Sequence, residues 1–273
     1  MYSSSRLFQV LLLALLQLSV ALSSSATGGS STSSNKVVLV TGGGRGIGRA
    51  TCLLLAQRGW KVALNYCQDE EAAKQVVEQG DGNIVAFQAD VSQPDQVARL
   101  YNEIYETFQS NPQGLVNNAA VMEMMEKDIK KIQHETLLRD LQVNTCGPFY
   151  CTQEFVKRAS TQNGGTGGSI VCISSISAES AQILAYGMSK AALEAMVAGL
   201  SKNLPLEGIR INTIQPGLID TGLASKEIMD RMSGVIPLRR PGLPEEVAKA
   251  VAFLLSDDSS YCSGTKLRVA GGL

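Results

Sequence analysis

Short β-branched runs alternate with segments of helical periodicity along almost the whole chain after residue 36. The runs lie at 37–41, 61–65, 84–87, 114–117, 169–174, 209–214 and 266–269. The helical segments lie at 47–58, 70–79, 94–108, 132–143, 148–160, 186–203, 226–232 and 245–255, and Ser92 is the expected cap of the third. Parallel strands need crossovers of this length. The alternation therefore predicts an α/β fold with a single doubly wound parallel sheet and helices on both faces.

The first 34 residues do not follow this pattern. Arg6 is the only charged residue before Lys36, residues 7–22 are apolar apart from three polar side chains, and 23–34 are small or hydroxylated. A basic start and an apolar stretch of about 15 residues are typical of a signal peptide, whereas a membrane span needs about 20. We expect a leader and Ser-rich linker at 1–34 and one domain at 35–273. The leader favours routing through the endoplasmic reticulum, to the secretory pathway or a plastid, over a mitochondrial or membrane-anchored location.

Composition excludes several functional classes. Basic and acidic residues number 24 and 25, so the composition gives no excess of positive charge for binding nucleic acid. Aromatic residues make up only 5% of the chain, which argues against a surface on which sugars or bases stack. The six cysteines form no C-x-x-C pair and there is one histidine, His134, which argues against a zinc site. We therefore expect no metal and no disulfide framework in this domain.

A glycine-rich turn follows the first expected strand and opens the first helix. Residues 41–48 read TGGGRGIG. Glycines let a backbone approach a pyrophosphate, and the N-terminus of a helix offers unpaired N–H groups and partial positive charge. The turn predicts a dinucleotide site, with a plain tight turn as the alternative. The cofactor-binding candidates here are Thr41, Gly42, Arg45, Gly46, Ile47 and Gly48.

The end of the second strand indicates which cofactor binds. NAD sites place a carboxylate there to bind the ribose 2′-hydroxyl, but this strand ends in Asn65, Tyr66 and Cys67. Arg45 can pair with a 2′-phosphate, so the sequence favours NADP(H). The alternative is that Arg45 is a solvated loop cation and that Asp69 turns into the site.

The most informative pair is Tyr186 and Lys190, four residues apart on an expected helix. At this spacing the phenol and the ammonium share one helix face. A nearby ammonium stabilises phenolate, so we expect the pKa of Tyr186 to be lowered and the phenol to exchange a proton near neutral pH. Ser175, eleven residues earlier at the end of a strand, is the candidate for polarising a carbonyl oxygen, with Ser174 as the alternative.

Together these motifs resemble the main group of short-chain dehydrogenases/reductases, from about Lys36 to the C-terminus. The resemblance rests on residues 41–48, Asp90-Val91, Asn117-Asn118-Ala119, Val143-Asn144, Ser175, Tyr186 with Lys190, and Pro216-Gly217 followed by Thr221. It implies a Rossmann-like fold.

The resemblance also implies roles for the catalytic candidates. Tyr186 would be the general acid, and Lys190 would lower its pKa and hold the nicotinamide ribose. Ser175 would bind the substrate carbonyl, and Asn144 would hold a water that links Lys190 to solvent. The further implied cofactor contacts are Asn65, Asp90, Val91, Asn117, Pro216, Gly217, Ile219 and Thr221, together with Tyr186 and Lys190. Structural roles without cofactor or substrate contact stay open for three of these residues. Asp90 can cap its own turn, Asn117 can serve the fold alone, and Asn144 can bond the backbone at a helix break.

The C-terminal part, 233–273, resembles 3-oxoacyl-[acyl-carrier-protein] reductases and related carbonyl reductases. The expected function is therefore NADPH-dependent reduction of a ketone, in a small molecule or a 3-oxoacyl thioester, with acyl carrier protein as a candidate partner. The alternatives are a general carbonyl or quinone reductase and a non-catalytic NADP-binding subunit. Residues 218–237 are the expected substrate lid. The apolar face of helix 186–203, which includes Leu193 and Val197, implies a homotetramer by resemblance, or else burial within one subunit.

Overall fold

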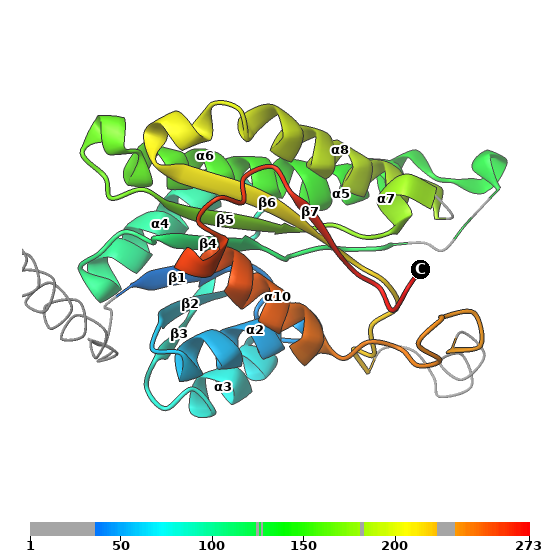
Figure 1. Ribbon diagram of the computed structural model, residues 1–273, viewed down its shortest axis with the longest axis horizontal. Coiled ribbons are helices and arrows are strands. Elements are labelled where there is room, and N and C mark those ends of the chain that lie inside the picture. The colour runs from blue at the N-terminus through cyan, green and yellow to red at the C-terminus, as the bar shows by residue number, and fades with distance from the viewer. Residues whose placement is uncertain (1–35, 124–125, 127, 181–182, 223–232) are drawn as a thin grey trace, which may run out of the picture. The chain divides into compact units, whose positions relative to one another are not determined.

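The computed structural model describes residues 36–123, 126, 128–180, 183–222 and 233–273. They contain a seven-stranded parallel sheet in the order β3-β2-β1-β4-β5-β6-β7 (Figure 1). The strands are β1 (Val37–Val40), β2 (Lys61–Tyr66), β3 (Ile84–Gln88), β4 (Gly114–Asn117), β5 (Gly168–Ile173), β6 (Ile209–Pro216) and β7 (Lys266–Val269). The predicted fold class is confirmed. The predicted leader and the predicted helix 226–232 lie outside the described residues.

Helices cover both faces of the sheet (Figure 1). They are α2 (Gly46–Gln57), α3 (Glu70–Glu78), α4 (Pro94–Phe108), α5 (His134–Leu141), α6 (Gly147–Ala159), α7 (Ser177–Ser180), α8 (Leu184–Leu200) and α10 (Pro244–Leu255). One core cluster lies under α2, α3 and α10, and the other under α4, α6 and α8. Side chains of a strand alternate between faces, so in β1 Val37 and Leu39 enter one cluster and Val38 and Val40 the other.

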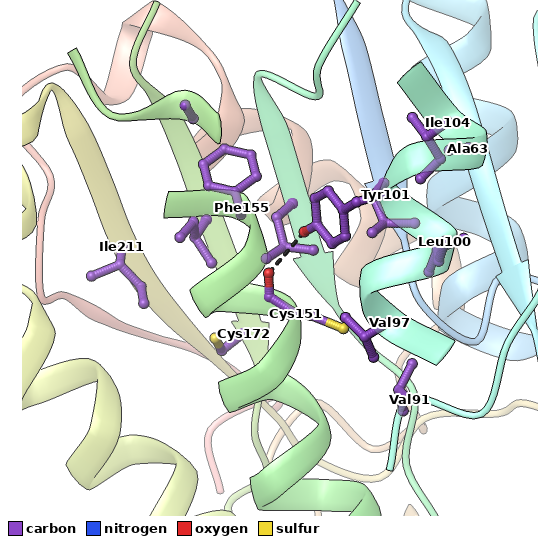
Figure 2. Packing of buried hydrophobic residues seen from close by; sticks show 14 of the residues in the cluster. Ala63, Val91, Val97, Leu100, Tyr101, Ile104, Cys151, Phe155, Cys172 and Ile211 are labelled. Atoms are coloured by element: carbon purple, nitrogen blue, oxygen red, sulfur yellow. Dashed lines mark hydrogen bonds between the residues drawn. The ribbon is translucent and has the colours of Figure 1, made fainter. Parts of the chain in front are cut away.

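The core between α4 and α6 holds the largest fully buried side chains. Tyr101 and Phe155 have no exposed surface, and the Tyr101 hydroxyl donates a hydrogen bond to the Cys151 carbonyl over 2.8 Å (Figure 2). A buried hydroxyl needs such a partner. The bond fixes α4 against α6 on the face of the sheet that also carries α8.

The helical region 132–160 differs from the prediction in one respect that matters for the site. The expected break between two helices is a π-helical turn at Gln142–Cys146, which joins α5 directly to α6. A π turn inserts one residue into the helical repeat, so the apolar periodicity changes phase there and imitates a break.

One further expectation was wrong. The N-cap of α4 is Gln93, without a side-chain cap bond, because the Ser92 hydroxyl donates to Asp90 Oδ1 over 2.7 Å. On the apolar face of α8, Leu193 and Val197 are buried in the core, whereas Met196 and Leu200 are only partly buried. The homotetramer stays a prediction.

All six cysteines are free thiols. Among the described residues, no helix combines the length and the apolar character that a membrane span needs.

Candidate active site

The glycine turn between β1 and α2 can be built only from glycine at several positions. Gly42 and Gly46 have φ of 63° and 51°, in the left-handed region. A Cβ atom placed on Gly48 would lie 2.2 Å from the Gly42 carbonyl oxygen. The Asn118 amide donates to the carbonyl oxygens of Thr41 and Gly42 over 2.9 and 3.0 Å. Asn118 therefore fixes the path of the turn, and Thr41, buried beneath it, accepts the N–H groups of Asn118 and Ala119.

The N-terminus of α2 is left free to bind an anion. Its N-cap residue, Arg45, makes no side-chain cap bond, and no acidic residue occupies the first turn. The first N–H groups of a helix lack intrahelical partners and carry partial positive charge. A side-chain-free glycine cradle in front of such a terminus fits the pyrophosphate of a dinucleotide. Gly42, Gly46, Ile47 and Gly48 are the residues that would hold it.

Arg45, the candidate for binding a 2′-phosphate, forms an ion pair with Asp69, the carboxylate of the alternative interpretation. Arg45 is exposed, and its Nε lies 3.6 Å from Asp69 Oδ2. Asp69 also caps α3, since its Oδ1 accepts the Ala72 N–H over 3.0 Å. Arg45 thus lies beside the carboxyl end of β2, as the 2′-phosphate argument requires, but shares its charge with Asp69.

The amide nitrogen of Asn65 donates hydrogen bonds within the protein. It is 2% exposed, and its Nδ2 donates to the carbonyl oxygens of Ala89 and Phe87 over 2.9 and 3.4 Å. Asn117 is equally buried, and its Nδ2 donates to Thr152 Oγ1 over 3.1 Å. Both amide nitrogens therefore join the ends of neighbouring elements, whereas the buried Asn117 Oδ1 has no hydrogen-bond partner among the described residues, so its cofactor contact stays a prediction.

Asp90 caps its own turn. Its Oδ1 accepts the Ser92 N–H and hydroxyl over 2.9 and 2.7 Å, and its Oδ2 lies 3.6 Å from Arg139 Nη1. Burial opposes the charge, but these hydrogen bonds and the Arg139 charge lower the pKa of Asp90. Val91 is buried against Gly147, so its side chain serves the core.

The carboxyl ends of the strands bring the catalytic candidates together, as the prediction requires. Lys190 of α8 is 2% exposed; its Nζ donates to the Ile173 carbonyl at the end of β5 over 2.8 Å and lies 5.6 Å from the centre of the Tyr186 ring. Burial lowers the pKa of Lys190 to about 8. The pair thus combines a phenol with an ammonium that can titrate near neutral pH.

The choice between the two serines is decided by their partners. The Ser174 hydroxyl is buried and donates to Glu194 Oε1 over 2.7 Å. Ser175 Oγ accepts the Ser177 N–H over 3.1 Å and hydrogen-bonds with Tyr186. Only Ser175 therefore joins the tyrosine.

The pKa of Tyr186 differs from the predicted lowering. Burial raises the pKa of Tyr186, the hydrogen bond with Ser175 lowers it in part, and the Asp140 carboxylate raises it further. Lys190 does not produce the predicted lowering of the Tyr186 pKa because its Nζ lies over the ring and because burial disfavours the ammonium form of Lys190 itself. A raised pKa keeps the phenol protonated, which suits a proton donor.

Asn144 sits in the π turn and is completely buried. Its Oδ1 accepts the Val121 N–H over 2.8 Å, and its Nδ2 donates to the Val121 carbonyl over 2.8 Å and to Ser189 Oγ over 3.0 Å. The amide therefore bonds backbone at the helix irregularity, and the predicted water-holding role stays a prediction. Ser189, which sequence reasoning missed, anchors this turn to α8.

The segment after β6 borders the same edge of the sheet. Gly217 N–H donates to the Val269 carbonyl over 3.0 Å, and Ile219 bridges to Gly242. Pro216 ends β6, and Thr221 lies close to the glycine turn, since a Cβ atom on Gly46 would be 3.0 Å from Thr221 Cγ2. Of the predicted lid, residues 223–232 lie outside the described residues.

A family model described as Enoyl-(Acyl carrier protein) reductase matches residues 42–273. The chain belongs to the short-chain dehydrogenase/reductase family. It is 39% identical to the oxidoreductase YgfF of Escherichia coli over 243 residues, covering 85% of this chain and 98% of that protein. It is 37% identical to mouse (3R)-3-hydroxyacyl-CoA dehydrogenase, covering 86% and 94% of the two chains.

A solved family structure, a mutant enzyme from Serratia marcescens, superposes with a TM-score of 0.79 at 30% identity, covering 87% of this chain and 97% of that one. Other relatives have varied dehydrogenase and reductase names, and these include a sugar dehydrogenase. The chain is therefore an oxidoreductase of this family, and family members typically bind a nicotinamide cofactor.

Proposed function

We propose that the protein is an NADPH-dependent reductase that converts a ketone into a secondary alcohol. The observation that carries the proposal is the Tyr186 phenol, hydrogen-bonded with Ser175 and adjacent to Lys190, at the sheet edge that also holds the glycine turn. NADPH, when bound, supplies a hydride. The chain supplies the proton: Tyr186 donates it to the substrate oxygen, and the Ser175 hydroxyl donates a hydrogen bond to the same oxygen.

The preference for NADPH rests on charge at the end of β2. Arg45 is exposed beside that end, and the strand residues Asn65 and Tyr66 carry no negative charge. Asp69 competes for Arg45, so Arg45→Ala should raise the KM for NADPH far more than the KM for NADH. Asp69→Asn is the matched variant, because it frees Arg45 and should favour NADPH further. Equal effects of Arg45→Ala on both cofactors would contradict this proposal.

We propose a 3-oxoacyl thioester as the substrate. Support comes from the mouse relative, which is named for a 3-hydroxyacyl thioester, and from the C-terminal resemblance described above. Acyl carrier protein is the proposed protein partner. The test is NADPH oxidation with acetoacetyl-CoA, acetoacetyl carrier protein, a quinone, a steroid ketone and an aldose. Preferential turnover of the thioesters supports the proposal, and turnover of another carbonyl class alone refutes it.

The catalytic assignment has its own test. Tyr186→Phe keeps the ring and removes the acid, so it should abolish nearly all turnover and leave NADPH binding measurable by fluorescence. A wild-type chain that binds NADPH but turns over no carbonyl compound would identify a non-catalytic subunit instead. Light scattering tests the proposed homotetramer, and N-terminal sequencing of the secreted or organellar protein tests the proposed leader at 1–34.

A further inference from the structure

Asp140 of α5 is a buried carboxylate with an unfilled hydrogen-bonding capacity. It has no exposed surface. Its Oδ1 accepts the Glu123 N–H over a long 3.4 Å, and its Oδ2 has no hydrogen-bond partner among the described residues. Buried polar atoms are almost always bonded, and an unpaired buried charge is costly. A buried carboxylate that keeps an unpaired oxygen despite this cost indicates a functional role.

The position of Asp140 in the fold supplies that reason. It lies one helical turn before Asn144, whose amide bonds Ser189 of α8 over 3.0 Å. Ser189 directly precedes Lys190, and its hydroxyl donates to the Tyr186 carbonyl over 2.7 Å. Because α5 packs against α8, Asp140 belongs to the same buried polar cluster as the catalytic pair.

The charges in this cluster leave Lys190 dependent on Asp140. Burial lowers the pKa of Lys190, while Cys172 and Asp140 are the groups that raise it. Burial raises the pKa of the Cys172 thiol to about 11, so this thiol is neutral near pH 7. Burial raises the pKa of Asp140, the hydrogen bond from the Glu123 N–H lowers it in part, the Glu123 charge raises it, and the Lys190 charge lowers it. Among the described residues that act on Lys190, Asp140 is thus the one acid that can carry negative charge.

We propose that Asp140 is a positioning residue of this active site, whose buried carboxylate is the counter-charge that keeps Lys190 an ammonium and Tyr186 a protonated phenol. It touches neither substrate nor cofactor and acts through the two catalytic residues. This role rests on the proposed function, in which a protonated Tyr186 reduces a carbonyl group. A counter-charge acts through the low dielectric of the protein interior, so Asp140 needs no direct bond to Lys190 for this role.

The first test needs no substrate. Tyrosine ionisation is followed by ultraviolet difference spectroscopy, and the Tyr186 contribution is obtained by subtracting the same titration of a Tyr186→Phe partner. In Asp140→Asn the Tyr186 midpoint should fall by about one pH unit, since a nearby negative charge no longer opposes the phenolate. An unchanged or raised midpoint overturns the proposal. If Asp140→Asn does not fold, Asp140→Leu is titrated in its place.

The matched control is Glu154→Gln. Glu154 is also a buried carboxylate, but it lies on α6 and is paired with Lys157 and Arg158. Its loss should lower stability without moving the Tyr186 midpoint. A shift in Glu154→Gln as large as that in Asp140→Asn would mean that general loosening, rather than the Asp140 charge, moves the phenol.

The second test uses the proposed reaction. The alkaline limb of kcat/KM for carbonyl reduction should move down by about one pH unit in Asp140→Asn, with the NADPH Kd unchanged, and Asp140→Glu should restore part of it. Lower activity with an unmoved limb would identify a structural role and overturn the proposal. If the wild-type chain reduces no carbonyl compound, the proposed function fails, while the phenol titration still decides the role of Asp140.

Discussion

Replacing Lys190 with methionine should change how the stability of the fold depends on pH. Lys190 is 2% exposed, and burial lowers its pKa from 10.5 to about 8. At 1.36 kcal/mol for each pKa unit, holding the ammonium in the folded state costs about 3 kcal/mol at neutral pH. Methionine fills a similar volume without that charge. It also loses the 2.8 Å bond from Nζ to the Ile173 carbonyl, which adds a penalty that does not depend on pH.

The sign follows from proton binding in the two states. Between about pH 8 and the unfolded value of 10.5, the unfolded chain holds the Lys190 proton and the folded chain has released it, so the stability of the wild type rises with pH. Lys190→Met lacks this gain. The quantity to compare is the free energy of unfolding of Lys190→Met minus that of the wild type. This difference should fall by about 2 kcal/mol between about pH 8 and pH 9.5, and it should be nearly constant around pH 7.

Urea unfolding followed by circular dichroism, at fixed protein concentration and several pH values, measures this difference. Titrating groups that do not interact with Lys190 contribute equally to both proteins and cancel, and the neighbouring Cys172 thiol, with a pKa of about 11, titrates above this range. Lys202→Met, at an exposed position beyond α8, is the control and should give a difference that does not change with pH. A flat difference for Lys190→Met would refute the reasoning, because it would mean that the folded state does not disfavour the ammonium.

Three smaller predictions each concern one residue. Gly48→Ala should weaken NADPH binding at least tenfold in a fluorescence titration, because its Cβ would lie 2.2 Å from the Gly42 carbonyl oxygen. The control is Gly199→Ala, where the Cβ has open space around it. This variant should raise the free energy of unfolding by about 0.5–1 kcal/mol and leave NADPH binding unchanged. Asn144→Ala removes three buried bonds and should cost about 3 kcal/mol in urea unfolding; a loss below about 1 kcal/mol would contradict the bonding described. Tyr101→Phe removes only the bond to the Cys151 carbonyl and should cost about 1 kcal/mol, so an unchanged melting temperature would count against it.

The elements of the fold were predictable because their signals are local. The strands are short runs rich in β-branched and other apolar residues, and each crossover has room for a helix, so the order of elements already implies a parallel sheet. The π turn at Gln142–Cys146 was not predictable, because its stability depends on bonds from Asn144 to Val121 and Ser189, which are distant in the sequence.

Asp140 shows the same limit within the site. The sequence placed an aspartate four residues before Asn144, next to leucines, and this spacing on one helix face was the one available signal. Its burial, however, is a property of the packing of α5 on α8. An exposed aspartate on an amphipathic helix has the same local pattern, so only the tertiary structure separates the two cases.

The asparagines at the carboxyl edge explain why cofactor contacts were harder to predict than catalytic ones. Asn65, Asn117, Asn118 and Asn144 all lie near the site, yet every one of these amides bonds protein groups. An amide donates and accepts at once, so it can join two backbone segments at a strand end as readily as it can bind a ligand. A phenol four residues from a lysine has fewer structural uses. The fit of this edge to a dinucleotide therefore rests on the backbone of the turn and the N-terminus of α2, which the amides hold in place.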